Sequence, residues 1–235
     1  MQTGKVYLLP TVLYDDALQT IPPYVLDAVK DCQVFFTENE RTARRFLKSI
    51  WREMVIDTYQ WFTIHKAEEE VKQSFLKLLR EGRNIGIISE AGCPGIADPG
   101  QLLVEAAQQH HIVVTPLVGP SSILLALMAS GMNGQCFQFH GYLPIDAQER
   151  KKKLKELENA SLKQKCTQLF IETPYRNNPL IKDILQALQD DTRLCIAVDI
   201  TAASESILTK TIREWKKNVP DIHKRPAIFL VQAGK

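Results

Sequence analysis

Residues 89–100, with the sequence SEAGCPGIADPG, carry the clearest chemical signal in the chain. Glycine at 92, 95 and 100 lets the backbone approach a ligand closely and adopt positive φ, and proline at 94 and 99 stiffens its path. Such a loop can direct N–H and C=O groups at a polar cofactor. It lacks the GxGxxG motif of dinucleotide-binding loops and the GKS or GKT of phosphate-binding loops. The alternative interpretation is a long, rigid connection between a strand and a helix.

A second group of polar residues follows an apolar run at 34–37. In the segment TENERTA (37–43), Glu38 is a candidate general base and Arg41 a candidate substrate-binding residue. Acidic residues that favour a helix N-terminus explain this segment equally well. Asp15 and Asp16 are weaker candidates for the base.

Tyr175 and Arg176 follow the tripeptide ETP. An aromatic ring and a guanidinium group can stack a base and hold a phosphate, although a helix start also explains the pair. The basic segment ERKKKLKELE (149–158) can follow an RNA backbone, but an exposed helix with solvated charges explains it better.

Predicted strands and helices, which must position these residues, alternate along the first half of the chain. Because the strands are apolar on both faces, they predict a parallel sheet with helices on both sides, and ligands bind such sheets beyond the carboxyl ends of the strands. The loop 89–100 follows one of these ends. Strands are expected at 6–9, 34–37, 54–57, 85–89 and 112–115, and helices at 22–29, 42–50, 68–80 and 101–109.

The second half continues the alternation after a short connector, PLVGPSS (116–122). We therefore expect two α/β domains, residues 1–116 and 117–235, the second with a mixed sheet. Strands are expected at 137–140, 167–171 and 193–198 and in the segments ESILTK and PAIFLVQ, and helices at 123–130, 150–157 and 179–188 and in the segment TIREW.

Composition excludes several classes of protein. No apolar run is long enough for a membrane span, and no secretory signal is evident. Five scattered cysteines without CxxC spacing predict reduced thiols in a cytoplasmic protein, and His110–His111 lacks a third ligand, so no metal site is expected. The net charge is −3 over residues 1–115 and +5 over the remainder, which permits a polyanionic partner without requiring one.

Four consecutive motifs resemble one family of enzymes. They are SEAGCPGIADPG (89–100), PLVGPSSILLALMASGM (116–132), FQFHGYLPID (137–146) and FIETPYRNN (170–178). In order and spacing they are similar to the tetrapyrrole-methylase superfamily of S-adenosylmethionine (SAM) methyltransferases. Within it they look most like the branch that methylates a cytidine ribose 2′-oxygen of small-subunit ribosomal RNA. The resemblance implies two α/β domains, a cofactor cleft between them, and a homodimer.

The resemblance also implies roles for individual residues. The segment TENERTA (37–43) keeps Glu38 and Arg41, the catalytic and substrate-binding candidates, from the pattern of the branch, and the substrate-binding candidates Tyr175 and Arg176 lie in its fourth motif. The implied cofactor-binding residues are Ser89, Glu90, Ala91, Gly92, Cys93, Ile96, Ala97 and Asp98 in the first domain, Ser121 and Ser122 at the junction, and Tyr142, Leu143, Glu172 and Thr173 in the second.

The substrate half departs from the pattern of the branch. PTVLYDDALQTIPP (10–23) lacks a glycine and an asparagine, TENERTA (37–43) lacks an Asp-Thr pair, and VDITA (198–202) lacks an arginine and a lysine. The leading hypothesis is a SAM-dependent methyltransferase acting on ribosomal RNA. The alternatives are methylation of a tetrapyrrole or another small molecule, and a SAM- or RNA-binding protein without turnover.

Overall fold

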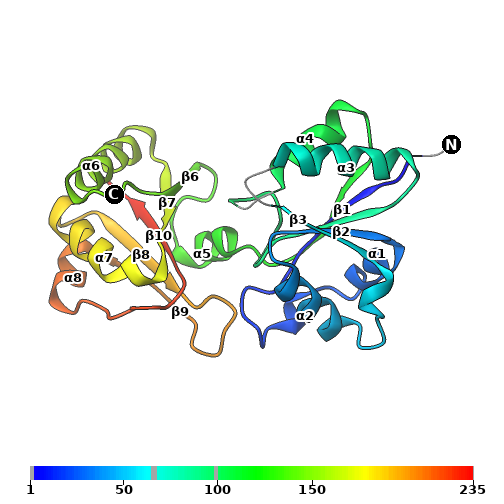
Figure 1. Cartoon of the computed structure of the whole chain (residues 1–235). Helices are drawn as coiled ribbons and strands as arrows, with labels where there is room; N and C mark the ends of the chain where they lie inside the picture. Colours follow the sequence, from blue (N-terminus) through cyan, green and yellow to red (C-terminus); the bar gives the residue numbers. More distant parts are fainter. Residues whose placement is uncertain (1–2, 65–67, 98–99, 235) are drawn as a thin grey trace. The chain divides into compact units, whose positions relative to one another are not determined.

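The computed structural model describes residues 3–64, 68–97 and 100–234 (Figure 1). It divides into two compact units, residues 1–121 and residues 122–235. The division falls after Ser121, a few residues later than the boundary at 116 expected from the sequence.

Unit 1 contains a sheet of five parallel strands in the order β3-β2-β4-β1-β5. Valine, isoleucine and phenylalanine dominate the inner strands β2 and β4, which are buried along their whole length. Burial on both faces is what a parallel sheet requires, so the predicted sheet type is confirmed. The strands are β1 (Val6–Leu9), β2 (Val34–Thr37), β3 (Gln60–Thr63), β4 (Ile85–Ile88) and β5 (Val114–Pro116).

Helices cover both faces of this sheet (Figure 1). Helices α1 (Val25–Asp31) and α2 (Glu40–Ile50) pack on the face that presents Phe35. Helices α3 (Glu68–Arg80) and α4 (Gln101–Gln109) pack on the face that presents Phe36. Two short 3-10 turns, η1 (Leu18–Thr20) and η2 (Ile56–Thr58), connect these elements.

Unit 2 contains a mixed sheet in the order β6-β7-β10-β8-β9, as expected. Strands β6 and β7 are parallel, whereas β10 is antiparallel to both of its neighbours and β9 is antiparallel to β8. The strands are β6 (Phe137–Tyr142), β7 (Thr167–Ile171), β8 (Arg193–Val198), β9 (Ser206–Thr211) and β10 (Ala227–Gln232). The helices are α5 (Ser122–Ser130), α6 (Ala147–Gln164), η3 (Pro174–Arg176), α7 (Asn177–Ala187) and α8 (Ile212–Lys217).

The core of unit 2 lies between the sheet and helices α6, α7 and α8. Phe170 and Phe229, on adjacent strands, stack with ring centroids 5.8 Å apart at its centre. Trp215 of α8 is buried there and donates its indole N–H to the Leu194 carbonyl at 2.9 Å. Helix α5 packs against β9 and β10, where the Thr209 hydroxyl donates to the Ser130 carbonyl at 2.8 Å.

Three expected elements differ from the structure. The strand predicted at 54–57 is wrong: η2 overlaps the end of that range, and the edge strand β3 begins six residues later than predicted, at Gln60. The helix expected from residue 22 begins at Val25, because Pro22 and Pro23 form the preceding turn. Helix α6 is longer than predicted, since Asp146 caps its N-terminus and Lys165 ends it in the left-handed conformation.

No described helix combines the length and apolar character needed to cross a bilayer.

Candidate functional site

The loop after β4 is tied to the loops after β1 and β2. All three strands are parallel and adjacent, so their carboxyl ends meet at one edge of the sheet. The Thr11 N–H donates to the Gly92 carbonyl at 2.8 Å, and the Thr11 hydroxyl lies 3.5 Å from the Ser89 carbonyl oxygen. The Glu90 N–H donates to Glu38 Oε2 at 3.0 Å. The structure therefore brings Glu38 to the cofactor loop predicted from the sequence.

Gly92 turns the loop in a conformation that favours glycine, with φ of +73°. A Cβ added there would lie 3.1 Å from the Leu13 side chain and 3.3 Å from the Pro120 carbonyl oxygen. The absence of a side chain at Gly92 thus lets the loop lie close to two neighbouring loops of unit 1, those of Leu13 and Pro120. Cys93, next in the chain, has its sulfur 3.5 Å from the Pro120 carbonyl oxygen.

The rest of the loop is more open. Gly95 has φ of +80°, and a Cβ added there would meet no heavy atom within 4 Å. Ile96 and Ala97 are exposed, Ala97 with φ of +62°. Asp98, also predicted to bind the cofactor, lies outside the described residues.

A pocket of about 260 Å³ with both polar and apolar walls opens on one side of this loop. Ser89, Glu90 and Ala91 form part of its wall, so three of the predicted cofactor residues line it. Asp15 and Arg45 face each other across an ion pair of 3.2 Å at its rim, both largely exposed. The remaining lining residues are Thr11, Val12, Leu13, Tyr14, Leu18, Thr42, Ala43, Phe46 and Ser49.

A second, mainly apolar pocket of about 390 Å³ lies on the other part of the loop. Cys93 and Ile96, both predicted to bind the cofactor, line it. The other lining residues are Leu8, Pro94, Gly95, Gln101, Val104, Pro116 and Leu117. Apolar walls with exposed loop backbone are typical of sites for small organic ligands.

Helix α2 places its arginines at the same edge. Asn39 caps the helix, because its side chain accepts from the N–H groups of Arg41 at 3.1 Å and Thr42 at 3.4 Å. Arg41 is exposed on the first turn. Arg44 instead pairs with Glu40 at 2.5 Å, and its guanidinium lies 5.0 Å from the centre of the Trp61 ring.

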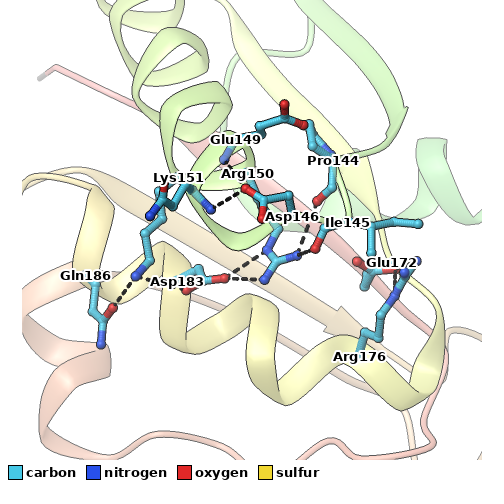
Figure 2. A network of polar contacts seen from close by, with 11 residues as sticks. Pro144, Ile145, Asp146, Glu149, Arg150, Lys151, Glu172, Arg176, Asp183 and Gln186 are labelled. Carbon is cyan, nitrogen blue, oxygen red and sulfur yellow. Dashed lines mark hydrogen bonds and ion pairs between the residues drawn. The ribbon is translucent and has the colours of Figure 1, made fainter.

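In unit 2, Tyr142 is the last residue of β6 and Leu143 follows it, at the sheet edge where β7 ends, since Tyr142 pairs with Ile171. Tyr142 is exposed and Leu143 is buried. The following turn is held by Arg150, which donates to the carbonyl oxygens of Pro144 at 3.2 Å and Ile145 at 2.7 Å (Figure 2).

Arg150 is itself buried and paired with Asp183 of α7. Its Nε lies 2.9 Å from Asp183 Oδ2, and its Nη2 contacts the same oxygen. The other Asp183 oxygen lies 3.3 Å from the Lys151 ammonium, which also donates to Gln186 (Figure 2). The basic segment 149–158 therefore includes a structural arginine that fixes the turn after Leu143.

Glu172 and Arg176 contact each other. One oxygen of Glu172 accepts from the Thr173 N–H at 2.6 Å and from Arg176 Nε and Nη2 at 3.0 and 2.7 Å (Figure 2). The Glu172 side chain is only 1% exposed, so this ion pair is partly buried. The structure thus joins a predicted cofactor residue to a predicted substrate residue, while Tyr175 between them is exposed.

Ser121 and Ser122 stand at the division between the units, Ser122 as the first residue of α5, and both are half-buried. Within the described residues, no three His, Cys, Asp or Glu side chains cluster so as to hold a metal ion.

The sequence reasoning missed two arrangements. The Arg45–Asp15 pair and the Arg150–Asp183 pair each join residues about thirty positions apart. Such pairs cannot be predicted from a local sequence pattern, because helical and strand periodicity indicate only which face of an element is buried.

A model of the tetrapyrrole (corrin/porphyrin) methylases matches residues 17–216, most of the chain. The chain belongs to the tetrapyrrole methylase family. Its enzyme class and cofactor are those of this family, namely a methyltransferase that depends on SAM. Both were expected from the sequence.

Curated relatives in this family carry a more specific name. Ribosomal RNA small subunit methyltransferase I of Vibrio cholerae serotype O1 is 32% identical over 203 residues, which cover 86% of this chain and 67% of that protein. The protein of the same name from Haemophilus influenzae is 29% identical over 98% of this chain and 79% of its own length.

Solved structures of tetrapyrrole methylases share the fold. The methyltransferase CobJ superposes with a TM-score of 0.65 and 15% identity, covering 99% of this chain and 95% of that one. Uroporphyrin-III C-methyltransferase from Thermus thermophilus, solved with S-adenosyl homocysteine, gives a TM-score of 0.59 and 14% identity over 97% of each chain. At these identities the likeness shows the fold alone.

The described part of unit 1 fits the cofactor of a tetrapyrrole methylase. The apolar pocket has the size and walls that an adenine ring or a methionine chain requires, and the loop beside it leaves space at Gly95. Cys93, Gly95 and Ile96 are the residues of this pocket that would lie against it.

Proposed function

We propose that this methyltransferase transfers the methyl group of SAM to a ribose 2′-oxygen of small-subunit ribosomal RNA. The observation that carries the proposal is similarity to relatives named ribosomal RNA small subunit methyltransferase I over 86% to 99% of the chain. The tetrapyrrole alternative has support from the description of the family model and from structural neighbours at 16% identity or below, which report the fold, whereas the curated relatives carry the ribosomal RNA name.

The proposed cofactor residues are those expected from the sequence. In unit 1 they are Ser89 to Cys93 and Ile96 to Asp98, followed by Ser121 at the unit's end. In unit 2 they are Ser122, Tyr142, Leu143, Glu172 and Thr173. When bound, SAM supplies an activated methyl group, and the protein must align an oxygen nucleophile with it.

The pocket of about 260 Å³ that Asp15 and Arg45 line is the proposed site for the methyl-accepting ribose. It shares the loop 89–97 with the apolar pocket, so an acceptor on one side of the loop and a donor on the other would be neighbours. A ribose hydroxyl is a poor nucleophile, and a nearby carboxylate acceptor assists it. Asp15 lines the pocket and is paired with Arg45, whereas Glu38 Oε2 accepts from the Glu90 N–H, so both carboxylates are candidates for this role.

Charged side chains near the pocket suit a nucleic acid. Arg45 stands at the rim, and Arg41 is exposed one turn earlier on α2. Both can approach phosphates that flank the accepting ribose, which would make RNA affinity fall as salt rises.

The proposal includes a cytoplasmic homodimer. A cytoplasmic location follows from a ribosomal RNA substrate. The nine-residue helix α5 leaves Met128 79% exposed, which supports pairing with a second copy. Sedimentation should give twice the chain mass of 26.7 kDa, and a single-chain mass at micromolar concentration would reject the dimer.

The test is transfer of tritiated methyl from SAM to small ribosomal subunits from cells that lack this protein. Alkali-resistant dinucleotides carrying the label would identify a 2′-O-methyl product, because the 2′-hydroxyl is what permits alkaline cleavage. Label in a small molecule but not in RNA would favour the tetrapyrrole alternative. SAM binding without any transfer would favour a binding protein.

A further inference from the structure

Tyr175 presents an exposed aromatic ring beside the His223 ring and the Lys224 ammonium, which come from a distant part of the sequence. It lies on η3 and is 67% exposed. The His223 ring is nearly perpendicular to it, at 76° with centroids 6.0 Å apart. The Lys224 ammonium lies over the Tyr175 ring, 5.7 Å from its centroid. We refer to Tyr175, His223 and Lys224 as the aromatic platform.

Backbone contacts hold the two parts of the platform together. The Lys224 N–H donates to the Pro174 carbonyl at 3.0 Å, directly beside Tyr175. Asn178, just after η3, accepts from the Ile222 N–H at 3.1 Å and donates to Asp221 at 2.8 Å. Asp221 also accepts from the His223 N–H at 3.1 Å. The rings are therefore positioned before any ligand arrives.

The backbone at Lys224 adopts φ of +63°, which a side chain other than glycine rarely does. From this position its ammonium lies over the ring. The two neighbouring arginines are engaged elsewhere, Arg176 with Glu172 at 2.7 Å and Arg225 with Asp199 at 2.8 Å. Lys224 is thus the cation that the fold brings to Tyr175.

We infer that the aromatic platform is a stacking site for one unpaired RNA base, with Lys224 neutralising the adjoining phosphate. An exposed aromatic ring with a cation beside it is the chemistry that single-stranded nucleic acids recognise. A base inside a duplex keeps both faces stacked and cannot use it. The inference rests on the proposed function, since it names how the RNA substrate is held.

The test measures the anisotropy of a short fluorescein-labelled oligouridylate bound to the full chain, with the same RNA in duplex form as comparison. Tyr175→Ala should weaken single-strand binding at least about fivefold, while Tyr175→Phe should retain it because the ring remains. Lys224→Ala should weaken binding and lower the slope of log affinity against log salt by about one. Lys217→Ala removes an exposed charge on α8 and serves as the matched control.

Equal oligouridylate affinity for wild type and Tyr175→Ala, both folded by circular dichroism, would overturn the platform. An equal effect of Tyr175→Ala on single-strand and duplex RNA would also overturn it. Methyl transfer to ribosomal RNA is measured separately on the wild type. Absence of transfer would reject the proposed function, whereas transfer with intact binding by Tyr175→Ala would reject the platform alone.

Discussion

Glu38 and Glu90 are joined by a hydrogen bond in which the Glu90 N–H donates to the Glu38 carboxylate at 3.0 Å. The contact connects the end of β2 to the first residues of the loop after β4. In this contact Glu38 holds the loop, and its role as general base stays a prediction.

Glu38→Ala should weaken SAM binding by about tenfold, or 1.4 kcal/mol, because it leaves the loop without this acceptor. Glu38→Gln keeps an oxygen that can accept the same hydrogen bond, so its affinity should stay within about threefold of the wild type. Calorimetric titration with SAM measures both.

Methyl-transfer rates decide whether Glu38 acts as a base. For a positioning residue, Glu38→Gln should retain most of kcat, while Asp15→Asn should lower kcat by about a hundredfold if Asp15 assists the ribose hydroxyl. A large loss of kcat in Glu38→Gln with unchanged SAM affinity would identify Glu38 as the general base.

Gly92→Val should fold but bind SAM at least about tenfold more weakly, a loss of 1.4 kcal/mol. Valine resists the φ of +73° and brings its Cβ to 3.1 Å from Leu13, so the loop must shift. Titration calorimetry measures the loss. Gly131→Val is the control, because Gly131 also has positive φ but its Cβ would meet no atom within 4 Å. Equal SAM affinity for Gly92→Val and wild type would mean that the loop is only a rigid connector.

Arg150→Met should lower the free energy of unfolding by about 3 kcal/mol, because Asp183 would then be a buried carboxylate without its arginine. Urea unfolding followed by tryptophan fluorescence measures the change. Lys153→Met, in an exposed pair with Glu156, should cost less than about 0.5 kcal/mol. Similar losses for both variants would show that the Arg150 network contributes little.

The Tyr7 hydroxyl donates to Asp31 Oδ2 at 2.5 Å. This hydrogen bond, with burial and the charge of Asp31, raises the pKa of Tyr7 from 10.0 to about 12. The folded protein therefore holds the phenol proton more tightly than the unfolded chain does. The resulting stability is fully present below pH 10.0 and is lost as the pH rises through about 12.

Between those pH values the wild type should lose stability more steeply than Tyr7→Phe in urea unfolding experiments. Burial also raises the pKa of Tyr59 and of the Cys32 thiol. Both residues remain in the variant, so the difference between the two proteins isolates Tyr7. Parallel pH curves would contradict the assignment.

The inner strands could be predicted from the sequence because they are continuously apolar, as at Ile85–Ile88. Strand β3 escaped prediction because it lies at the edge and none of its four residues is fully buried. Its pairing depends on contacts distant in sequence, such as Phe62 stacked on Phe36 with centroids 4.7 Å apart. For the same reason, the loop 89–100 was recognisable from its glycines, while its partners Glu38 and Thr11 required the folded sheet.

Each sheet has an inner strand drawn from one extreme of its own unit. In unit 1, β1 lies between β4 and β5. Residues 6–9 therefore gain their strand partners only after residues 85–88 and 114–116 have been synthesised. In unit 2, β10 lies between β7 and β8, so that sheet stays open until residues 227–232 have left the ribosome. During synthesis neither unit can close strand by strand as it emerges. Unit 1 needs β4 to insert between β2 and β1, and unit 2 needs its last strand, β10, to insert between β7 and β8, so unpaired strand edges need protection until those moments.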